Sequence, residues 1–273
     1  MSVKLSAVIL TKNEEDKISR CIASVKWADE VLVIDDESTD KTREIAENLG
    51  ARVVVRPLNG DFAGQRNFGF QQAQGDWVLQ MDADEMAAGK LKNEIEKSLT
   101  DNCPYSAFII KRKEFFLGHF MQYGGWYIDE LKLFRRGACK YAHSVHERPQ
   151  VIGSIGRIDA DIEHYPFNSI FQYIERQNRY TSLEAEALFK EKGIVKIKEI
   201  KYNLWIKPLK LFFKLYFKKK GYKDGFYGLV YAILNSFRHF LRWAKYWEIV
   251  NNNHASPPPR RPSATSEVSK EFC

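Results

Sequence analysis

The densest group of charged side chains in the sequence lies at residues 82–85, which read Asp-Ala-Asp-Glu. Three carboxylates within four residues repel one another, and a cation among them relieves that repulsion. Hard oxygen ligands on a loop suit Mg²⁺ or Mn²⁺, which bind one or two carboxylates together with substrate phosphates. We therefore expect a bound cation that neutralises a leaving nucleotide. The alternative is a solvated acidic turn. We favour the cation site over this alternative, because a buried strand is expected directly before residue 82.

A second acidic group begins at Asp35 and reads Asp-Asp-Glu-Ser-Thr-Asp. A carboxylate here can accept a hydrogen bond from a base N–H or a ribose hydroxyl. Ser38 or Thr39 could instead cap a helix that has Asp40 in its first turn. Capping accounts for those three residues but leaves Asp35 and Asp36 without a structural reason, so we assign both to a ligand.

Two glycine-rich phosphate-binding motifs are missing from the sequence. No Gly-x-Gly-x-x-Gly follows the first expected strand, and no Gly-x-x-x-x-Gly-Lys-Ser/Thr occurs anywhere. Their absence argues against a dinucleotide-dependent oxidoreductase and against a P-loop enzyme. An acidic site that handles a phosphate then needs a metal, in agreement with the first acidic group.

The elements that must position these residues alternate between strand and helix. Over the first 110 residues the expected strands are 5–10, 31–34, 53–55 and 76–81. Helical patterns separate or follow them, opening at a cap on Asn13, at Ser38 or Thr39, near residue 65 and near residue 91. This alternation predicts βαβ units and a mostly parallel α/β sheet, which binds ligands beyond the carboxyl ends of its strands.

The second half of the chain has a different pattern. Short strands are expected at residues 105–111, 131–134, 145–152 and 162–165, followed by helices at about 169–192, 203–219 and 225–249. Pro208 is expected in the first turn of the second helix, where proline is tolerated. We divide the chain into an α/β domain at 1–167, a helical, basic and aromatic region at 168–250 and a disordered tail at 251–273.

Composition and charge bound the class of protein. The 273 residues are 44% hydrophobic and 28% charged, which excludes a collagen, a disordered chain and a multi-span membrane protein. The net charge of +7 divides unevenly: residues 1–110 carry −6, whereas residues 190–223 carry twelve lysines and two acids. The four cysteines form no zinc or redox motif. With no signal peptide or spanning helix expected, we predict a cytoplasmic protein.

Several motifs, taken in order, resemble family 2 glycosyltransferases with a GT-A fold. They are Thr11-Lys-Asn-Glu-Glu, Asp35-Asp-Glu-Ser-Thr-Asp and Asp82-Ala-Asp-Glu. The later motifs Gly124-Gly-Trp-Tyr, Leu133-Phe-Arg-Arg-Gly and Val145-His-Glu-Arg, with the aromatic helices, are similar to bacterial lipopolysaccharide core β-1,4-glucosyltransferases. The resemblance covers residues 3–249.

The resemblance implies a role for each matching residue. A UDP-sugar would contact ten of them: Thr11, Asn13, Glu14, Asp35, Asp36, Gln65, Arg66, Asn67, Asp82 and Arg135. Mg²⁺ or Mn²⁺ would be held by Asp84 and Asp82, with His164 as a late ligand. Arg135 could equally lie at an exposed strand end. His143 and His146 could suggest zinc, but without a cysteine partner they are more simply structural or substrate-positioning residues.

An inverting transferase needs a general base that deprotonates the acceptor hydroxyl. The sequence offers Asp129, which follows Gly124-Gly-Trp-Tyr, and Glu147 in the Val-His-Glu run. We favour Asp129 and keep Glu147 as the alternate. Glu147 could instead form an ion pair with Arg148 or Arg135.

The stretch from residue 196 to 247 interleaves lysines with aromatic residues. A basic amphipathic helix with aromatic anchors is typical of a membrane interface, and each lysine near an anionic leaflet contributes about 1 kcal/mol. Aromatics packed inward under solvated lysines are the plainer alternative. Nucleic acid is not expected as a partner, because residues 190–223 contain no arginine.

Together these features predict a metal-dependent, inverting hexosyltransferase at the inner face of the cytoplasmic membrane. It would move a hexose, glucose by preference, from a UDP-sugar to a lipid-linked saccharide such as the lipopolysaccharide core. Two alternatives stay open. One is a transferase for a capsule or exopolysaccharide precursor or a peptide, and the other is a non-catalytic protein that binds a nucleotide-sugar or a nucleic acid.

Overall fold

The structure, a computed structural model, describes residues 3–142 and 148–255. It divides into two compact units. The first, which we call the catalytic unit because it holds the acidic motifs, comprises Met1–Gln172 and Leu215–Tyr231. The second, the helical unit, comprises Tyr173–Lys214 and Ala232–Cys273. The chain therefore returns to the catalytic unit after its first excursion into helices.

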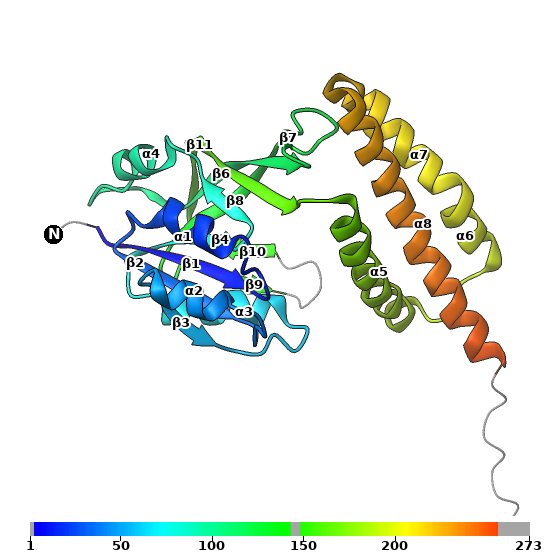
Figure 1. Cartoon of the computed structure of the whole chain (residues 1–273), viewed down its shortest axis with the longest axis horizontal. Coiled ribbons are helices and arrows are strands. Elements are labelled where there is room, and N and C mark those ends of the chain that lie inside the picture. The colour runs from blue at the N-terminus through cyan, green and yellow to red at the C-terminus, as the bar shows by residue number, and fades with distance from the viewer. Residues whose placement is uncertain (1–2, 143–147, 256–273) are drawn as a thin grey trace, which may run out of the picture. The chain divides into compact units, whose positions relative to one another are not determined.

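Four parallel strands form the first half of the main sheet, in the order β3-β2-β1-β4 (Figure 1). Their bounds are Leu5–Thr11 for β1, Glu30–Asp35 for β2, Arg52–Val55 for β3 and Trp77–Asp82 for β4. The four strands expected from the apolar runs are confirmed. The α/β class of the GT-A type with C-terminal helices is confirmed as well.

Helices cover this half of the sheet on both faces. Alternate residues of β1 point to opposite sides, so Ala7 and Ile9 pack with α1 (Ile18–Val25), α2 (Thr42–Asn48) and α4 (Leu91–Ser98). On the other face Val8 packs with α3 (Phe62–Gln72). Burial on both faces explains why these strands read as continuous apolar runs rather than as alternating ones.

The expected helix caps are wrong. The helices α1 and α2 begin after Lys17 and Lys41, and neither start has a side-chain cap. Asn13 adopts a positive φ of 51°, and its Oδ1 accepts a hydrogen bond from the Thr39 backbone N–H at 2.8 Å. In return, Ser38 Oγ accepts from the Asn13 N–H at 2.9 Å. The capping residues thus tie together the loops that follow β1 and β2.

The second half of the sheet is mixed. Here β8 (Ile128–Arg135) runs antiparallel to both β4 and β6 (Tyr105–Phe116), and β11 (Ser154–Phe167) runs parallel to β6. Two short strands complete it, β5 (Glu85–Ala87) on the edge against β11 and β7 (His119–Phe120) against β6. A separate hairpin pairs β9 (Cys139–Ala142) with β10 (Arg148–Val151).

The C-terminal helices are α5 (Ile170–Lys192), α6 (Ile197–Lys201), α7 (Lys207–Phe213) and α8 (Gly225–Ala255). In the helical unit they bury a cluster that includes Ala185, Ile200, Trp243 and Tyr246. The three helices expected in this region are confirmed. None of the helices in the described residues combines the length and apolarity that crossing a membrane requires.

Pro208 lies in the first turn of α7, as expected. The π-helical segment η1 (Tyr202–Ile206) joins α6 to α7 in one continuous run, and a second π-helical segment, η2 (Lys214–Lys218), follows α7. A proline inside an α-helix clashes with the carbonyl four residues before it. The wider π turn directly before Pro208, in which the Lys207 N–H donates to the Tyr202 carbonyl, accommodates the ring.

The contact between α3 and the sheet gives a stability test. A Cβ on Gly69 would lie 2.7 Å from Val8 Cγ1 and 3.3 Å from Ile34 Cγ1, both in the core. Alanine gains about 1 kcal/mol of helix propensity, but overpacking costs about 1–3 kcal/mol. We expect Gly69→Ala to lower the free energy of unfolding in urea by about 1 kcal/mol. Gly89→Ala, where a Cβ meets open space, is the control; equal effects of both would contradict this packing.

Candidate active site

Three acidic or hydroxyl-bearing strand ends meet at one edge of the parallel half-sheet. The β1 register pairs Thr11 with Asp35 of β2 and pairs Leu10 with Asp82 of β4. Backbone hydrogen bonds extend this alignment past the strands, from the Asp36 N–H to the Thr11 carbonyl and from the Ala83 N–H to the Leu10 carbonyl. The two acidic motifs, 47 positions apart, therefore become neighbours across one strand.

At the end of β1 and β2, two buried polar atoms find no hydrogen-bond partner among the residues that the structure describes: Thr11 Oγ1 and Asp35 Oδ1. The other carboxylate oxygen of Asp35 accepts from the Ser38 N–H at 2.8 Å. Asp36 differs, because its oxygens are occupied by Lys12 Nζ at 2.8 Å and by the Leu58 N–H at 2.7 Å. A buried acceptor left unpaired is rare and calls for a partner, such as a ligand N–H or hydroxyl.

Residues of α3 and of the loop after β1 hold this edge in shape. The Gln65 side chain exchanges two hydrogen bonds with Arg56, and the Asn67 amide bonds both backbone groups of Tyr141. Asn13 joins the two loops as described above. Glu14 forms an ion pair with Lys17 at 2.9 Å. These four predicted ligand residues thus have structural partners within the chain.

Arg66 of α3 is the residue that reaches the acidic cluster. Its Nη1 lies 3.1 Å from Asp82 Oδ1, and its guanidinium sits over the Tyr141 ring. Gln80 Nε2 donates to the same carboxylate oxygen at 3.3 Å. Burial alone would raise the pKa of Asp82, but Arg66 and Lys132 outweigh it and hold that pKa below its ordinary value. Asp82 is therefore an anion in the folded protein.

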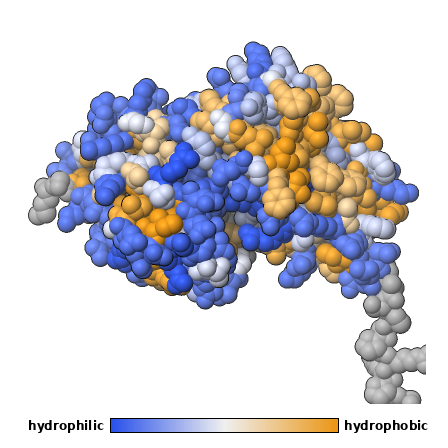
Figure 2. All heavy atoms as spheres, in the orientation of Figure 1, coloured by the Kyte–Doolittle hydropathy of each residue, from blue (hydrophilic) through white to orange (hydrophobic). Residues whose placement is uncertain are grey.

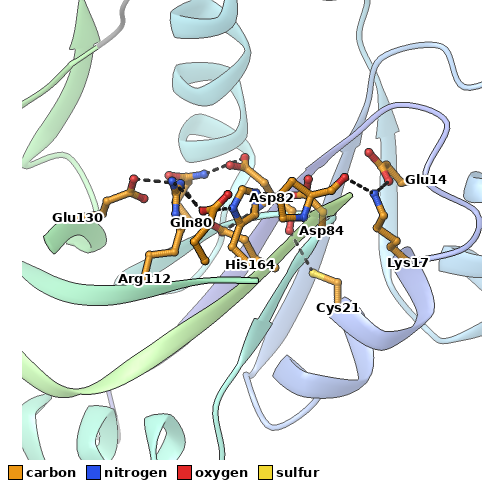
Figure 3. Close-up of polar contacts among 12 residues, drawn as sticks. Glu14, Lys17, Cys21, Gln80, Asp82, Asp84, Arg112, Glu130 and His164 are labelled. Atoms are coloured by element: carbon orange, nitrogen blue, oxygen red, sulfur yellow. Dashed lines mark hydrogen bonds and ion pairs between the residues drawn. The ribbon is translucent and has the colours of Figure 1, made fainter. Parts of the chain in front are cut away.

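Asp84 faces His164 of β11, with 3.3 Å between Asp84 Oδ1 and His164 Nε2 (Figure 3). The other ring nitrogen of His164 lies 2.7 Å from Glu114 Oε2. Burial would lower the pKa of His164, but Asp84 and Glu114 raise it to about 10. The imidazole therefore carries a proton between two carboxylates when no other cation is present.

These donors fit a divalent cation. A histidine that ligates a metal almost always has its second ring nitrogen fixed by a carboxylate, as Glu114 fixes His164. Carboxylate and imidazole together suit Mn²⁺, and such ions keep water and phosphate ligands. Across residues 3–142 and 148–255, no three cysteine, histidine or acidic side chains gather closely enough to hold a metal alone. A cation here would need substrate oxygens as well.

A buried ion pair supports the acidic loop from beneath. Glu85 is fully buried, and its two oxygens lie 2.7 and 2.8 Å from Lys132 Nζ, itself almost fully buried on β8. Glu85 Oε2 also accepts from the Asp82 N–H at 3.0 Å. Burial raises the pKa of Glu85 above its ordinary value, although Lys132 acts in the opposite direction. Burial alone would lower the pKa of Lys132, but the charges of Glu85 and Asp82 outweigh burial and hold that pKa above its ordinary value.

The sequence reading missed this supporting set. Arg112 of β6 lies 2.9 Å from Glu130, 3.5 Å from Glu114 and 4.0 Å from Glu85. A period-two alternation on β6 and β8 could have indicated it, because Arg112 and Glu114 share one face, as do Glu130 and Lys132. The sequence alone could not predict that β8 pairs with β4 or that β6 pairs with β11.

Two predicted site residues are not brought to this cluster. Asp129 precedes Glu130 on β8 and so points to the opposite face, where Arg157 binds both its oxygens at 2.6 and 2.7 Å. Arg135 pairs in register with Trp77, at the start of β4, whereas Asp82 ends that strand. Because β8 runs antiparallel to β4, Arg135 lies at the far end of the sheet and stacks on Trp77.

Three residues singled out in the sequence, His143, His146 and Glu147, lie outside the described residues.

The fold and the acidic edge define an α/β protein with a carboxylate-rich site at the ends of its parallel strands, and sequence comparison gives its class. Residues 6–103 match the family described as Glycosyl transferase family 2. An uncharacterized glycosyltransferase of Rickettsia typhi is 33% identical over 260 residues, covering 90% of this chain and 87% of the relative. The chain belongs to the family 2 glycosyltransferases.

A further relative is more specifically named. The Lipopolysaccharide core biosynthesis glycosyltransferase LpsC of Rhizobium meliloti is 26% identical over 255 residues, or 89% of this chain and 92% of that one. Among solved structures, glucosyl-3-phosphoglycerate synthase from Mycobacterium tuberculosis, in complex with Mn²⁺ and UDP, is 25% identical. That match has a TM-score of 0.35 and covers 41% of this chain and 44% of the synthase, less than half of either.

The buried ion pair gives a prediction for the site. Lys132→Met removes the close cation from a fully buried carboxylate, which typically costs about 3–5 kcal/mol. We expect urea unfolding to show a loss of about that size, and the double variant Glu85→Gln/Lys132→Met to recover most of it. A double variant as unstable as Lys132→Met would contradict compensation of Glu85 by Lys132.

Proposed function

We propose that this chain is a metal-dependent, inverting hexosyltransferase that uses a UDP-sugar, preferably UDP-glucose. The acceptor proposed is a lipid-linked saccharide such as the lipopolysaccharide core. The observation that carries the proposal is the row of strand ends in which unpaired acceptors on Thr11 and Asp35 lie beside the Asp82–Asp84 loop. One end of that row suits a nucleoside and the other a diphosphate.

The nucleoside end is built for neutral hydrogen-bond donors. Asp35 Oδ1 and Thr11 Oγ1 are buried and unpaired, so a base N–H or ribose hydroxyl would fill a need that water meets poorly there. Asp36, whose two oxygens are already occupied, supports the loop that carries Leu58. Between the two adjacent aspartates this favours Asp35 as the ligand contact.

The diphosphate end would combine Arg66 with a cation held by Asp84 and His164, and by Asp82 where its bond to Arg66 opens. A bound Mg²⁺ or Mn²⁺ supplies neutralisation of the negative charge that develops on the departing diphosphate. Arg66 provides a fixed positive charge at the same place. The similarity to LpsC, which is named as a lipopolysaccharide core biosynthesis glycosyltransferase, supports a lipopolysaccharide acceptor.

The transfer forms one bond and breaks one. The acceptor hydroxyl oxygen bonds to the anomeric carbon of the hexose as the bond from that carbon to the diphosphate oxygen breaks and UDP departs. A general base takes the hydroxyl proton. Asp129 is held by Arg157 on the other face of β8, which leaves Glu147 as the better of the two candidate bases.

The helical unit supports a location at the membrane surface. Several large apolar side chains are exposed on it: Ile197, Trp205, Ile206, Leu209, Phe213 and Phe237. Figure 2 shows apolar side chains gathered over the C-terminal helices. Lysines alternate with them along α6 and α7, as in an amphipathic interfacial helix. A capsule precursor or peptide acceptor remains the second candidate substrate class.

Donor use and metal dependence can be tested together. We expect UDP release from UDP-glucose in the presence of Mn²⁺, lower release from GDP- and ADP-glucose, and loss of release with excess EDTA. Asp84→Asn should lower kcat by at least about a hundredfold, in the range seen when charge stabilisation is removed. Full activity of Asp84→Asn, or of the wild type in EDTA, would remove the cation from the mechanism.

The choice of general base gives a separate prediction. Glu147→Gln should lower kcat about a hundredfold or more while the KM for the donor stays within a few-fold, because a base acts in the transition state. Asp129→Asn, which breaks only an exposed ion pair, should retain activity. The opposite ranking of the two variants in acceptor-dependent UDP release would return the role to Asp129.

A further inference from the structure

The segment Leu215–Tyr231 lies in the helical half of the sequence but belongs to the catalytic unit. It contains most of η2, the 3₁₀ turn η3 (Gly221–Asp224) and the first turns of α8. We call residues 217–227 the hairpin tip, since the chain reverses there between α7 and α8 (Figure 1). Neither the nucleotide site nor the transfer step uses it.

The hairpin tip is fastened to the loop that joins β7 to β8. The Gly124 N–H donates to the Lys219 carbonyl at 2.9 Å, and the Tyr123 N–H donates to Asp224 Oδ2 at 2.9 Å. His119 stacks on Tyr227 with ring centroids 4.4 Å apart. Three contacts of different kinds hold one end of this loop to one turn of chain, so the tip is a fixed part of the catalytic unit.

The same segment also reaches the candidate metal ligand. Tyr231 stacks on Phe116 with ring centroids 4.6 Å apart and contacts the Trp126 ring in a tilted arrangement at 4.5 Å. Its hydroxyl donates to Glu114 Oε1 at 3.4 Å. Glu114 is the carboxylate that fixes His164. A short series of direct contacts therefore joins the segment Leu215–Tyr231 to the acidic site.

The turn at the tip is tight and directs its long side chains outward. Lys220 adopts a left-handed conformation with φ of 61°, which is uncommon for any residue but glycine. A Cβ on Gly228 would lie 1.9 Å from the Gly221 carbonyl oxygen, so the two sides of the hairpin meet backbone to backbone. With no room inside, the lysine and aromatic side chains project into solvent.

The chemistry of that surface is basic and aromatic. Lys218, Lys219, Lys220 and Lys223 are exposed, and none forms an ion pair with a carboxylate among the residues that the structure describes. Lys223 Nζ lies over the Tyr123 ring, 5.2 Å from its centroid. The one acid of the tip, Asp224, is buried on backbone N–H groups. Beside the lysines, Phe226 is 77% exposed and Phe217 is 53% exposed, together with Tyr222 and Tyr227.

We infer that the hairpin tip docks the catalytic unit on an anionic lipid surface. Lysines that no carboxylate neutralises attract anionic headgroups, and an exposed phenylalanine among them gains by entering the acyl boundary. Nucleic acid is a poorer partner, because the tip contains no arginine to bind phosphates in a bidentate manner. This inference rests on the proposed function. Docking at the tip would hold the acidic site at a fixed distance from the membrane surface that carries the lipid-linked acceptor.

Vesicle flotation of the full chain tests this inference, using equimolar phosphatidylcholine and phosphatidylglycerol at low salt. Lys218→Glu/Lys220→Glu should weaken binding about thirtyfold or more, at about 1 kcal/mol for each lysine near the surface. Phe226→Ser should weaken binding to a smaller extent. The matched control Lys90→Glu/Lys92→Glu makes the same charge change at two exposed positions of the catalytic unit outside the tip and should weaken binding less.

The readouts separate this inference from the proposed function. UDP release from UDP-glucose with water as acceptor should be the same in wild type and in the tip variants, and their unfolding midpoints in urea should agree. No UDP release by the wild type would overturn the proposed function while leaving flotation informative. Tip variants that float like wild type, a control that loses as much binding, or a wild type that shifts an oligonucleotide but does not float would overturn the docking inference.

Discussion

Repulsion among the carboxylates of residues 82–85 is the constraint on which the rest of the site depends. Each acid of that loop is met by a cationic side chain from a different element: Asp82 by Arg66 of α3, Asp84 by His164 of β11, and Glu85 by Lys132 of β8. Because the third pair is buried, its strength is not screened by water. The loop can therefore hold its shape before any substrate or metal ion binds. Two of the three cationic side chains, His164 and Lys132, come from strands of the mixed half of the sheet.

The same pairing of strands explains which parts of the fold and of the site could be predicted from the sequence alone. Local patterns were sufficient for the parallel strands and for the meeting of Asp35 with Asp82, since carboxyl ends of parallel strands share one edge. They were not sufficient to place Asp129 and Arg135, because the position of each residue depends on a strand that lies elsewhere in the chain. The direction of β8 against β4 puts Arg135 at the end of the sheet far from Asp82, and the alternation along β8 puts Asp129 on the face opposite Glu130.

The missed helix caps have a related cause. Asn13, Ser38 and Thr39 carry the side chains that cap helices, and a single-sequence reading sees only the helix next to each. In the folded chain two such loops lie side by side, so the side chain of one finds the backbone of the other. The interaction is of the expected chemical kind, a side-chain oxygen accepting from a free N–H, but it fixes the ligand-binding edge instead of starting a helix.

Chain order misleads in one further respect. Residues 190–223 look like a single basic segment, yet the structure assigns Lys190–Lys214 to the helical unit and the lysines from Lys218 onward to the catalytic unit. The two groups meet different physical demands. From Tyr202 to Phe213 an exposed apolar side chain recurs every three or four residues among the lysines, which is the pattern of a helix lying on a surface. At the tip, by contrast, the Lys219 carbonyl and the Asp224 carboxylate accept hydrogen bonds from the backbone of Gly124 and Tyr123, which ties the lysines to the unit that carries His164.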